Sequence, residues 1–76
     1  MKWTRYDHPG SLSEYTASTE HYHAIIKDSY EGFTAEIIAR SNWNTIDNDI
    51  DMRCNLDLVK RSIWRRMIRL ENKYNA

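Results

Sequence analysis

Residues 21–40 read HYHAIIKDSYEGFTAEIIAR, and this stretch decides the fold. Two runs rich in isoleucine, alanine and aromatic residues flank a glycine, a pattern typical of two antiparallel strands joined by a tight turn. A turn at that glycine would place Ile26 opposite Ile37 and Lys27 opposite Glu36, which joins apolar residues and opposite charges. Because side chains alternate along a strand, one face is expected to form the core. That face holds Tyr22, Ala24, Ile26, Tyr30, Phe33, Ala35, Ile37 and Ala39.

After the hairpin, apolar and charged residues alternate from Ile46 to Cys54. A period of two predicts a further strand, with its apolar side, including Ile46 and Cys54, toward the core. Its charged side would face outward and would carry Asp47, Asp49 and Asp51.

The last segment, residues 55–74, has the features of an amphipathic helix. Asn55 is a good N-cap, and Asp57 stands in the first turn, where the helix dipole favours an anion. Apolar residues then recur at spacings of three and four, which predicts one buried stripe. The stripe consists of Leu56, Val59, Ile63, Met67, Leu70 and Tyr74.

The coarse order is therefore strands followed by one helix, which predicts an α+β domain over residues 1–76. The small antiparallel sheet would have three or four strands, three of them in residues 21–54, with the helix across its core face. Residues 1–20 are expected to form an N-terminal arm or an edge strand with a loop, because a Pro-Gly turn and a Ser/Thr-rich run interrupt them.

The composition limits the class of protein. With 76 residues and one cysteine, the chain can hold a single small domain without an internal disulfide. No apolar run approaches the length of a membrane span, and no apolar signal-peptide core is visible. The expected setting is the cytoplasm, which would be the host cytoplasm for a phage-encoded protein.

The net charge of zero hides an asymmetry. Residues 1–52 carry four basic and nine acidic residues, a net charge of −5, whereas residues 53–76 carry seven basic and two acidic residues, a net charge of +5. Such an asymmetry indicates either a charged partner or an acidic sheet that carries its own basic helix.

The predicted helix carries a basic spine opposite its apolar stripe. Arg61, Arg65, Arg69 and Lys73 are spaced by four residues, and Arg66 lies beside them. The spine could bind phosphates or an acidic protein surface, or it could be a solvated helix face.

An acidic strand face is the second candidate. Asp47, Asp49 and Asp51, with Glu36 if the strands are neighbours, could protect a sheet edge or recognise a basic partner. A calcium loop is not expected, because its glycine and glutamate positions hold Met52 and Leu58.

Nothing in the chain predicts an enzyme, a metal site or a cofactor. His21 and His23 are two ligands without a third, no phosphate-binding loop is present, and a buried Cys54 would be a poor nucleophile. Trp3 and Trp43 could pack on the sheet edge or anchor a partner. A homodimer could form through an apolar patch or an open sheet edge.

The segments Tyr22–Ile26 and Gly32–Ile38, a charged strand, and Leu58-Val59-Lys60-Arg61 at the start of a long helix follow one layout. This layout resembles small sheet-plus-helix accessory proteins of bacteriophages and prophages, including anti-CRISPR proteins and other inhibitors of host defence. The resemblance covers residues 20–73 and implies stoichiometric binding to a larger protein or ribonucleoprotein complex. A nucleic-acid-binding module that uses the basic spine is the alternative.

Overall fold

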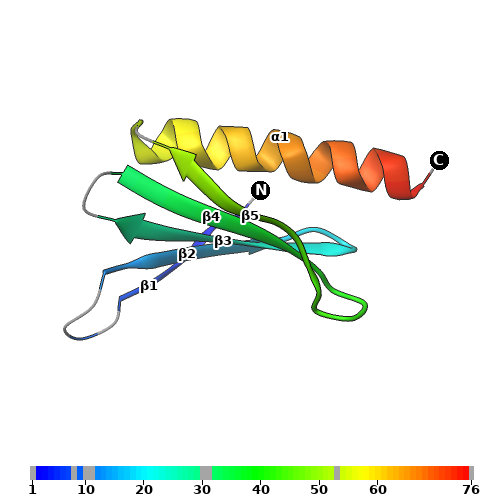
Figure 1. Ribbon diagram of the computed structural model, residues 1–76, viewed down its shortest axis with the longest axis horizontal. Coiled ribbons are helices and arrows are strands. Elements are labelled where there is room, and N and C mark those ends of the chain that lie inside the picture. The colour runs from blue at the N-terminus through cyan, green and yellow to red at the C-terminus, as the bar shows by residue number, and fades with distance from the viewer. Residues whose placement is uncertain (1, 8, 10–11, 30–31, 53, 76) are drawn as a thin grey trace.

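In the computed structural model, five strands and one helix follow in chain order (Figure 1). They are β1 (Thr4–Tyr6), β2 (Glu14–Ser18), β3 (Tyr22–Ser29), β4 (Gly32–Ala39), β5 (Thr45–Met52) and α1 (Leu56–Tyr74). The described residues are 2–7, 9, 12–29, 32–52 and 54–75, and for residues 29 and 49–52 only the backbone is described.

The strands form one antiparallel sheet in the order β1-β2-β3-β4-β5, so each strand pairs with its neighbour in sequence. The α+β class is confirmed. The predicted count of three or four strands was too low, because the structure has five.

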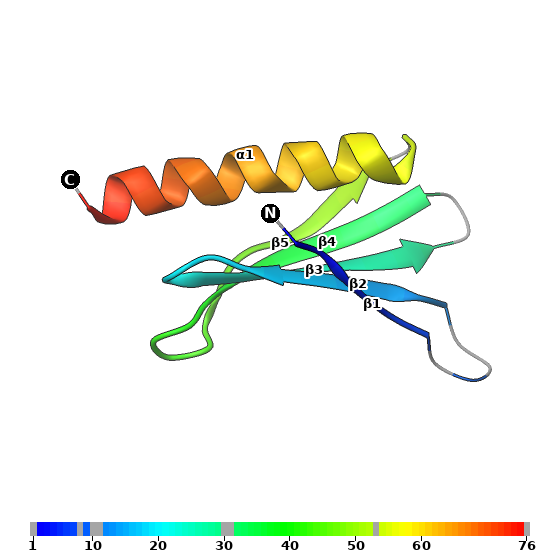
Figure 2. The ribbon, with the colours of Figure 1, turned by 180° about the vertical axis from the view of Figure 1, so that it is seen from behind.

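The helix α1 runs across one face of the twisted sheet and leaves the other face open (Figures 1 and 2). The core lies between these two layers and includes Ile26, Ile37, Ile63 and Met67, all fully buried. Figure 2 shows the N-terminal segment rising on the helix side of the sheet, where Trp3 packs against the core.

The predicted core face of the hairpin and the predicted stripe of the helix therefore meet along most of their length. Tyr74, at the end of the predicted stripe, is the exception, because it is 57% exposed. Tyr30 of the predicted core face lies outside the described residues.

The second strand, β2, is the element that the sequence pattern did not clearly predict. Tyr15 and Ala17 are buried, whereas the residues beside them are polar. The alternation is present, but a strand built around one tyrosine and one alanine gives little hydrophobic signal among serines and threonines. β2 is recognisable as a strand in the structure because it pairs with β3.

The register of the central hairpin differs from the prediction by two residues. Ile26 pairs with Ala35 and Lys27 pairs with Thr34, because Ser29 pairs with Gly32 and the glycine begins β4. The φ of Gly32 is 144°, a value that strongly favours glycine. A shift of two residues keeps every side chain on its face, so the hydrophobic pattern cannot distinguish the two registers.

The last strand, β5, corrects a second prediction. Its register with β4 shifts twice, between Ala35 and Ile37 and again between Ile37 and Ile38. Bulges of this kind re-aim side chains. As a result Asp47 lies opposite the buried Ile37, on the helix side of the sheet, and Ile46 is 48% exposed. Cys54, which was expected on the core side, is also exposed, because it follows the end of the strand.

Both ends of α1 are fixed. Asn55 is the predicted N-cap, and its Oδ1 accepts a hydrogen bond from the Leu58 backbone N–H at 3.0 Å. Near the C-terminus, Glu71 accepts hydrogen bonds from the Thr19 hydroxyl at 2.7 Å and from the His21 backbone N–H at 2.8 Å. The His21 ring lies 2.7 Å from the same carboxylate and stacks on Tyr74.

Burial alone would raise the pKa of Glu71, but the hydrogen bonds from His21 and Thr19 outweigh it and lower that pKa. The cluster of Thr19, His21, Glu71 and Tyr74 ties the helix end to the β2–β3 turn. It therefore holds the C-terminal end of the helix against the sheet.

Candidate binding face of the C-terminal helix

The outer side of α1 carries a row of four exposed cations, Arg61, Arg65, Arg69 and Lys73, which we call the basic face. The helix buries Val59, Ile63 and Met67 on its other side. Residues two positions after each of these, Arg61, Arg65 and Arg69, therefore point away from the core. At about 1.5 Å rise per residue, the row extends over about 18 Å. Because all four residues stand on one helix, their backbone positions follow a regular spacing along its axis.

None of these four cations has an ion pair or a side-chain hydrogen bond within the described part of the chain. The neighbouring Arg66 differs, because its Nη1 lies 3.0 Å from Asp47 Oδ2 on β5. The acidic sheet thus neutralises one helix cation and leaves the basic face unpaired. An anionic partner would meet charges that need not first be released from internal pairs.

The basic face is not flat. Arg61, Arg65 and Arg69, together with Leu58, Ser62 and Arg66, line a hollow of about 300 Å³. Leu58 is 48% exposed at this hollow. Guanidinium groups around an apolar side chain can bind a carboxylate through paired N–H donors and an adjoining apolar group by contact. Four residues of the predicted basic spine are thus exposed on one side of the helix, whereas Arg66 is half-buried and paired with Asp47.

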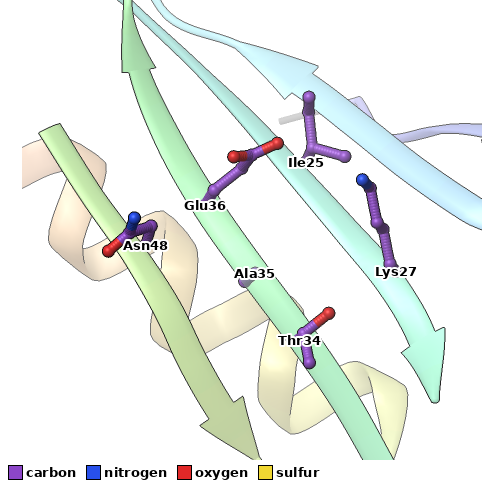
Figure 3. Close-up of a pocket in the computed structure, with 6 residues that line it drawn as sticks. All are labelled: Ile25, Lys27, Thr34, Ala35, Glu36 and Asn48. Atoms are coloured by element: carbon purple, nitrogen blue, oxygen red, sulfur yellow. The ribbon is translucent and has the colours of Figure 1, made fainter. Parts of the chain in front are cut away.

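The predicted acidic face is not one surface. Glu36 lies on the face of the sheet opposite α1, where it borders a hollow of about 180 Å³ beside Ile25, Thr34 and Asn48 (Figure 3). Asp47 lies on the helix side, in the pair with Arg66. The bulged register of β5 separates them. The side chains of Asp49 and Asp51 lie outside the described residues.

The two predicted aromatic anchors take different positions. Trp3 is half-buried and packs against the core. Trp43 stands at the β4–β5 turn, is 65% exposed and contacts the edge of the His23 ring at a centroid distance of 6.2 Å. Of the two, only Trp43 presents most of its indole to solvent.

The two histidines do not converge. The His21 ring lies beside Glu71, whereas His23 lies 2.6 Å from the Ser18 hydroxyl on the open face of the sheet. Burial, and then the nearby Arg40, lower the pKa of His23 below its usual 6.5. Within the described residues, no group of three or more histidine, cysteine or acidic side chains could hold a metal ion.

Sequence reasoning missed the exposed apolar residues that border the basic face. Leu58 could have been found, because it falls outside the apolar stripe, on the same side of the helical wheel as Arg65. Ile46 could not, because the alternation of its strand assigned it to the core and only the bulges bring it to the surface.

Comparison of the chain with protein-family models, with curated proteins and with solved structures finds no match. In the described part of the chain, no helix combines the length and apolar character that a bilayer span requires.

Proposed function

We propose that this protein is a small, non-enzymatic binding protein that uses the basic face of α1 to occupy an acidic surface of a larger protein. The observation that carries the proposal is the row of four exposed cations without ion pairs within the described chain. A row of like charges repels itself, and an anionic partner relieves that repulsion.

Two features favour an acidic protein over nucleic acid. The first is composition: three of the four cations are arginines, and exposed Leu58 lies among them, a mixture typical of protein interfaces. The second is the rest of the molecule, since residues 1–52 carry a net charge of −5 that would repel a polyanion. Among the described residues that line the hollow on the basic face, none is an aromatic residue on which a base could stack.

The layout of the chain, which resembles that of small phage accessory proteins, suggests the kind of partner. On this proposal the protein acts stoichiometrically in the cytoplasm, as an inhibitor of a host-defence complex, by covering an acidic patch that the complex needs. Nucleic acid bound through the basic face is the competing function, and the same experiment separates the two.

The experiment is affinity capture from a bacterial lysate, with and without nuclease treatment. We expect the wild type to capture a protein that nuclease does not release, and the double variant Arg61→Gln/Arg65→Gln to capture at least five times less. The matched control is Lys2→Gln/Lys27→Gln, which removes two exposed cations away from the helix and should capture as the wild type does.

Two results would contradict the proposal. Release of all bound material by nuclease, together with duplex binding whose log affinity falls with log salt at a slope of about −3.6, would indicate four phosphate contacts and a nucleic-acid-binding function. Equal capture by the wild type and by a folded Arg61→Gln/Arg65→Gln variant would show that the basic face is not the binding surface.

A further inference from the structure

A groove runs between the edge of the sheet and the helix, and it shares Arg69 and Lys73 with the basic face. It has a volume of about 440 Å³, and we call it the β5–α1 groove. Ile46 and Leu70 supply apolar surface, and the remaining lining residues are charged: Asp47, Arg66, Arg69 and Lys73. An apolar lining among cations is suited to a ligand that is both apolar and acidic.

The bulged register of β5 creates this lining. In a straight strand, Ile46 and Asp47 would point to opposite faces of the sheet. Here both line the groove, and Ile46 remains 48% exposed. A half-exposed isoleucine in a groove that cationic side chains also line is apolar surface that a ligand could cover.

The groove follows an open sheet edge. β5 pairs with β4 on one side, and within the described residues no strand lies on its other side. Edge strands can accept an extended segment of another chain, whose side chains then alternate between the two faces of the sheet. If an extended segment of another chain paired with the free edge of β5, every second side chain of that segment would point to the face of the sheet that α1 covers.

The charges select the chemistry of that segment. Arg66 is paired with Asp47, whereas Arg69 and Lys73 have no ion pair within the described chain. These two residues are four positions apart, about 6.0 Å along the helix, and residues i and i+2 of a strand are about 6.6 Å apart. Two acidic residues at alternate positions of a strand therefore match the spacing of Arg69 and Lys73.

We infer that the β5–α1 groove binds an extended acidic segment of the protein partner, with two acidic side chains at alternate positions toward Arg69 and Lys73. A leucine-sized side chain on the same face of the segment covers Ile46 and Leu70. This inference rests on the proposed function and specifies its partner. A second copy of this chain fits less well, because it would bring its own Arg69 and Lys73 to the same edge.

The test uses the full chain and the peptide Leu-Thr-Glu-Thr-Glu-Thr-Leu, with acetylated and amidated ends. In a two-dimensional amide NMR titration, we expect shifts centred on residues 45–48 and 66–73. Replacing both glutamates of the peptide by glutamine should weaken binding at least tenfold.

A matched pair of variants locates the site, because Ile46 and Leu58 are both 48% exposed but only Ile46 lines the groove. We expect Ile46→Ser to weaken the peptide about five times more than Leu58→Ser does. Both variants should stay folded, since neither side chain is in the core.

Three results would overturn the inference. One is the absence of peptide binding at millimolar concentration. The second is binding that Leu58→Ser weakens more than Ile46→Ser, which would place the acidic ligand on the outer helix face and leave the proposed function standing. The third is a dimer in sedimentation that Ile46→Ser dissociates, which would assign the groove to a second copy.

Discussion

Trp43 has the one positive φ among the described non-glycine residues, and relieving it should stabilise the protein. Its φ is 58°, in the left-handed region, where an ordinary L-residue costs about 1–2 kcal/mol. The turn holds it there: the Trp43 N–H donates to the Ala39 carbonyl at 2.8 Å, and the Asn44 N–H donates to Asn42 Oδ1 at 3.0 Å. Asparagine tolerates this conformation, whereas alanine does not.

The comparison that isolates the backbone cost is Trp43→Asn against Trp43→Ala. Both variants lose the edge contact with His23, which contributes about 0.5 kcal/mol at an exposed site. Only Trp43→Asn relieves the left-handed cost, so it should be more stable than Trp43→Ala by about 1 kcal/mol. In a domain of this size that difference raises the melting temperature by about 4–8 °C.

The assay is thermal unfolding followed by circular dichroism. Equal melting temperatures for the two variants would refute the reasoning, because they would show that the left-handed backbone costs nothing at this position. A melting temperature of Trp43→Asn at or above that of the wild type would show that the exposed indole is retained at the expense of stability. A binding role for Trp43 would explain why the tryptophan is kept despite this cost in stability.

Four further predictions concern the frame of the helix and the groove. Ile63→Ala removes a fully buried side chain and should lower the free energy of unfolding by about 2–5 kcal/mol, measured by urea denaturation. Asn55→Ala removes the N-cap hydrogen bond and should cost about 1 kcal/mol in the same assay. The lowered pKa of Glu71 means that its stabilisation is fully present above its usual 4.5 and is lost as pH falls through the folded-state value. Glu71→Gln should therefore be about 1–2 kcal/mol less stable than the wild type at neutral pH, with the gap closing in acid. Asp47→Asn should cost under about 1 kcal/mol, because its pair with Arg66 is partly exposed to solvent. It should also tighten binding of the acidic peptide, because it frees the Arg66 cation. Unchanged peptide affinity in Asp47→Asn would show that Arg66 does not contribute to the groove.

The helix was the most predictable part of the chain. Its cap at Asn55 and its stripe centred on Ile63 are local, and a 3.6-residue period over many turns is a strong signal. The buried face of the central hairpin was also predictable, since alternation fixes it in either register. The exact pairing was not, because Gly32 could close the turn or begin the strand.

The predictions that failed concern β2 and β5. The structure of these strands depends on contacts with a neighbouring strand or with the helix, which the local sequence does not show. β2 carries too little apolar surface to be recognised before β3 is placed beside it. In β5, the regular alternation of aspartates predicted one acidic face, but the bulges turn Asp47 toward Arg66 and Ile46 toward solvent. The four exposed cations of the basic face could be predicted from their spacing. The pairing of Arg66 with Asp47 and the β5–α1 groove could not, because both depend on that bulged register.

The central claim is that the basic face is the binding surface. It is tested most directly by the dissociation constant of the captured protein for the wild type and for the quadruple glutamine variant at Arg61, Arg65, Arg69 and Lys73. If each exposed charge pair contributes about 0.5–1 kcal/mol, the variant should bind about 30- to 1,000-fold more weakly while keeping its circular dichroism spectrum. A folded quadruple variant whose dissociation constant stays within about twofold of the wild-type value would contradict the account, because 1.4 kcal/mol already corresponds to tenfold.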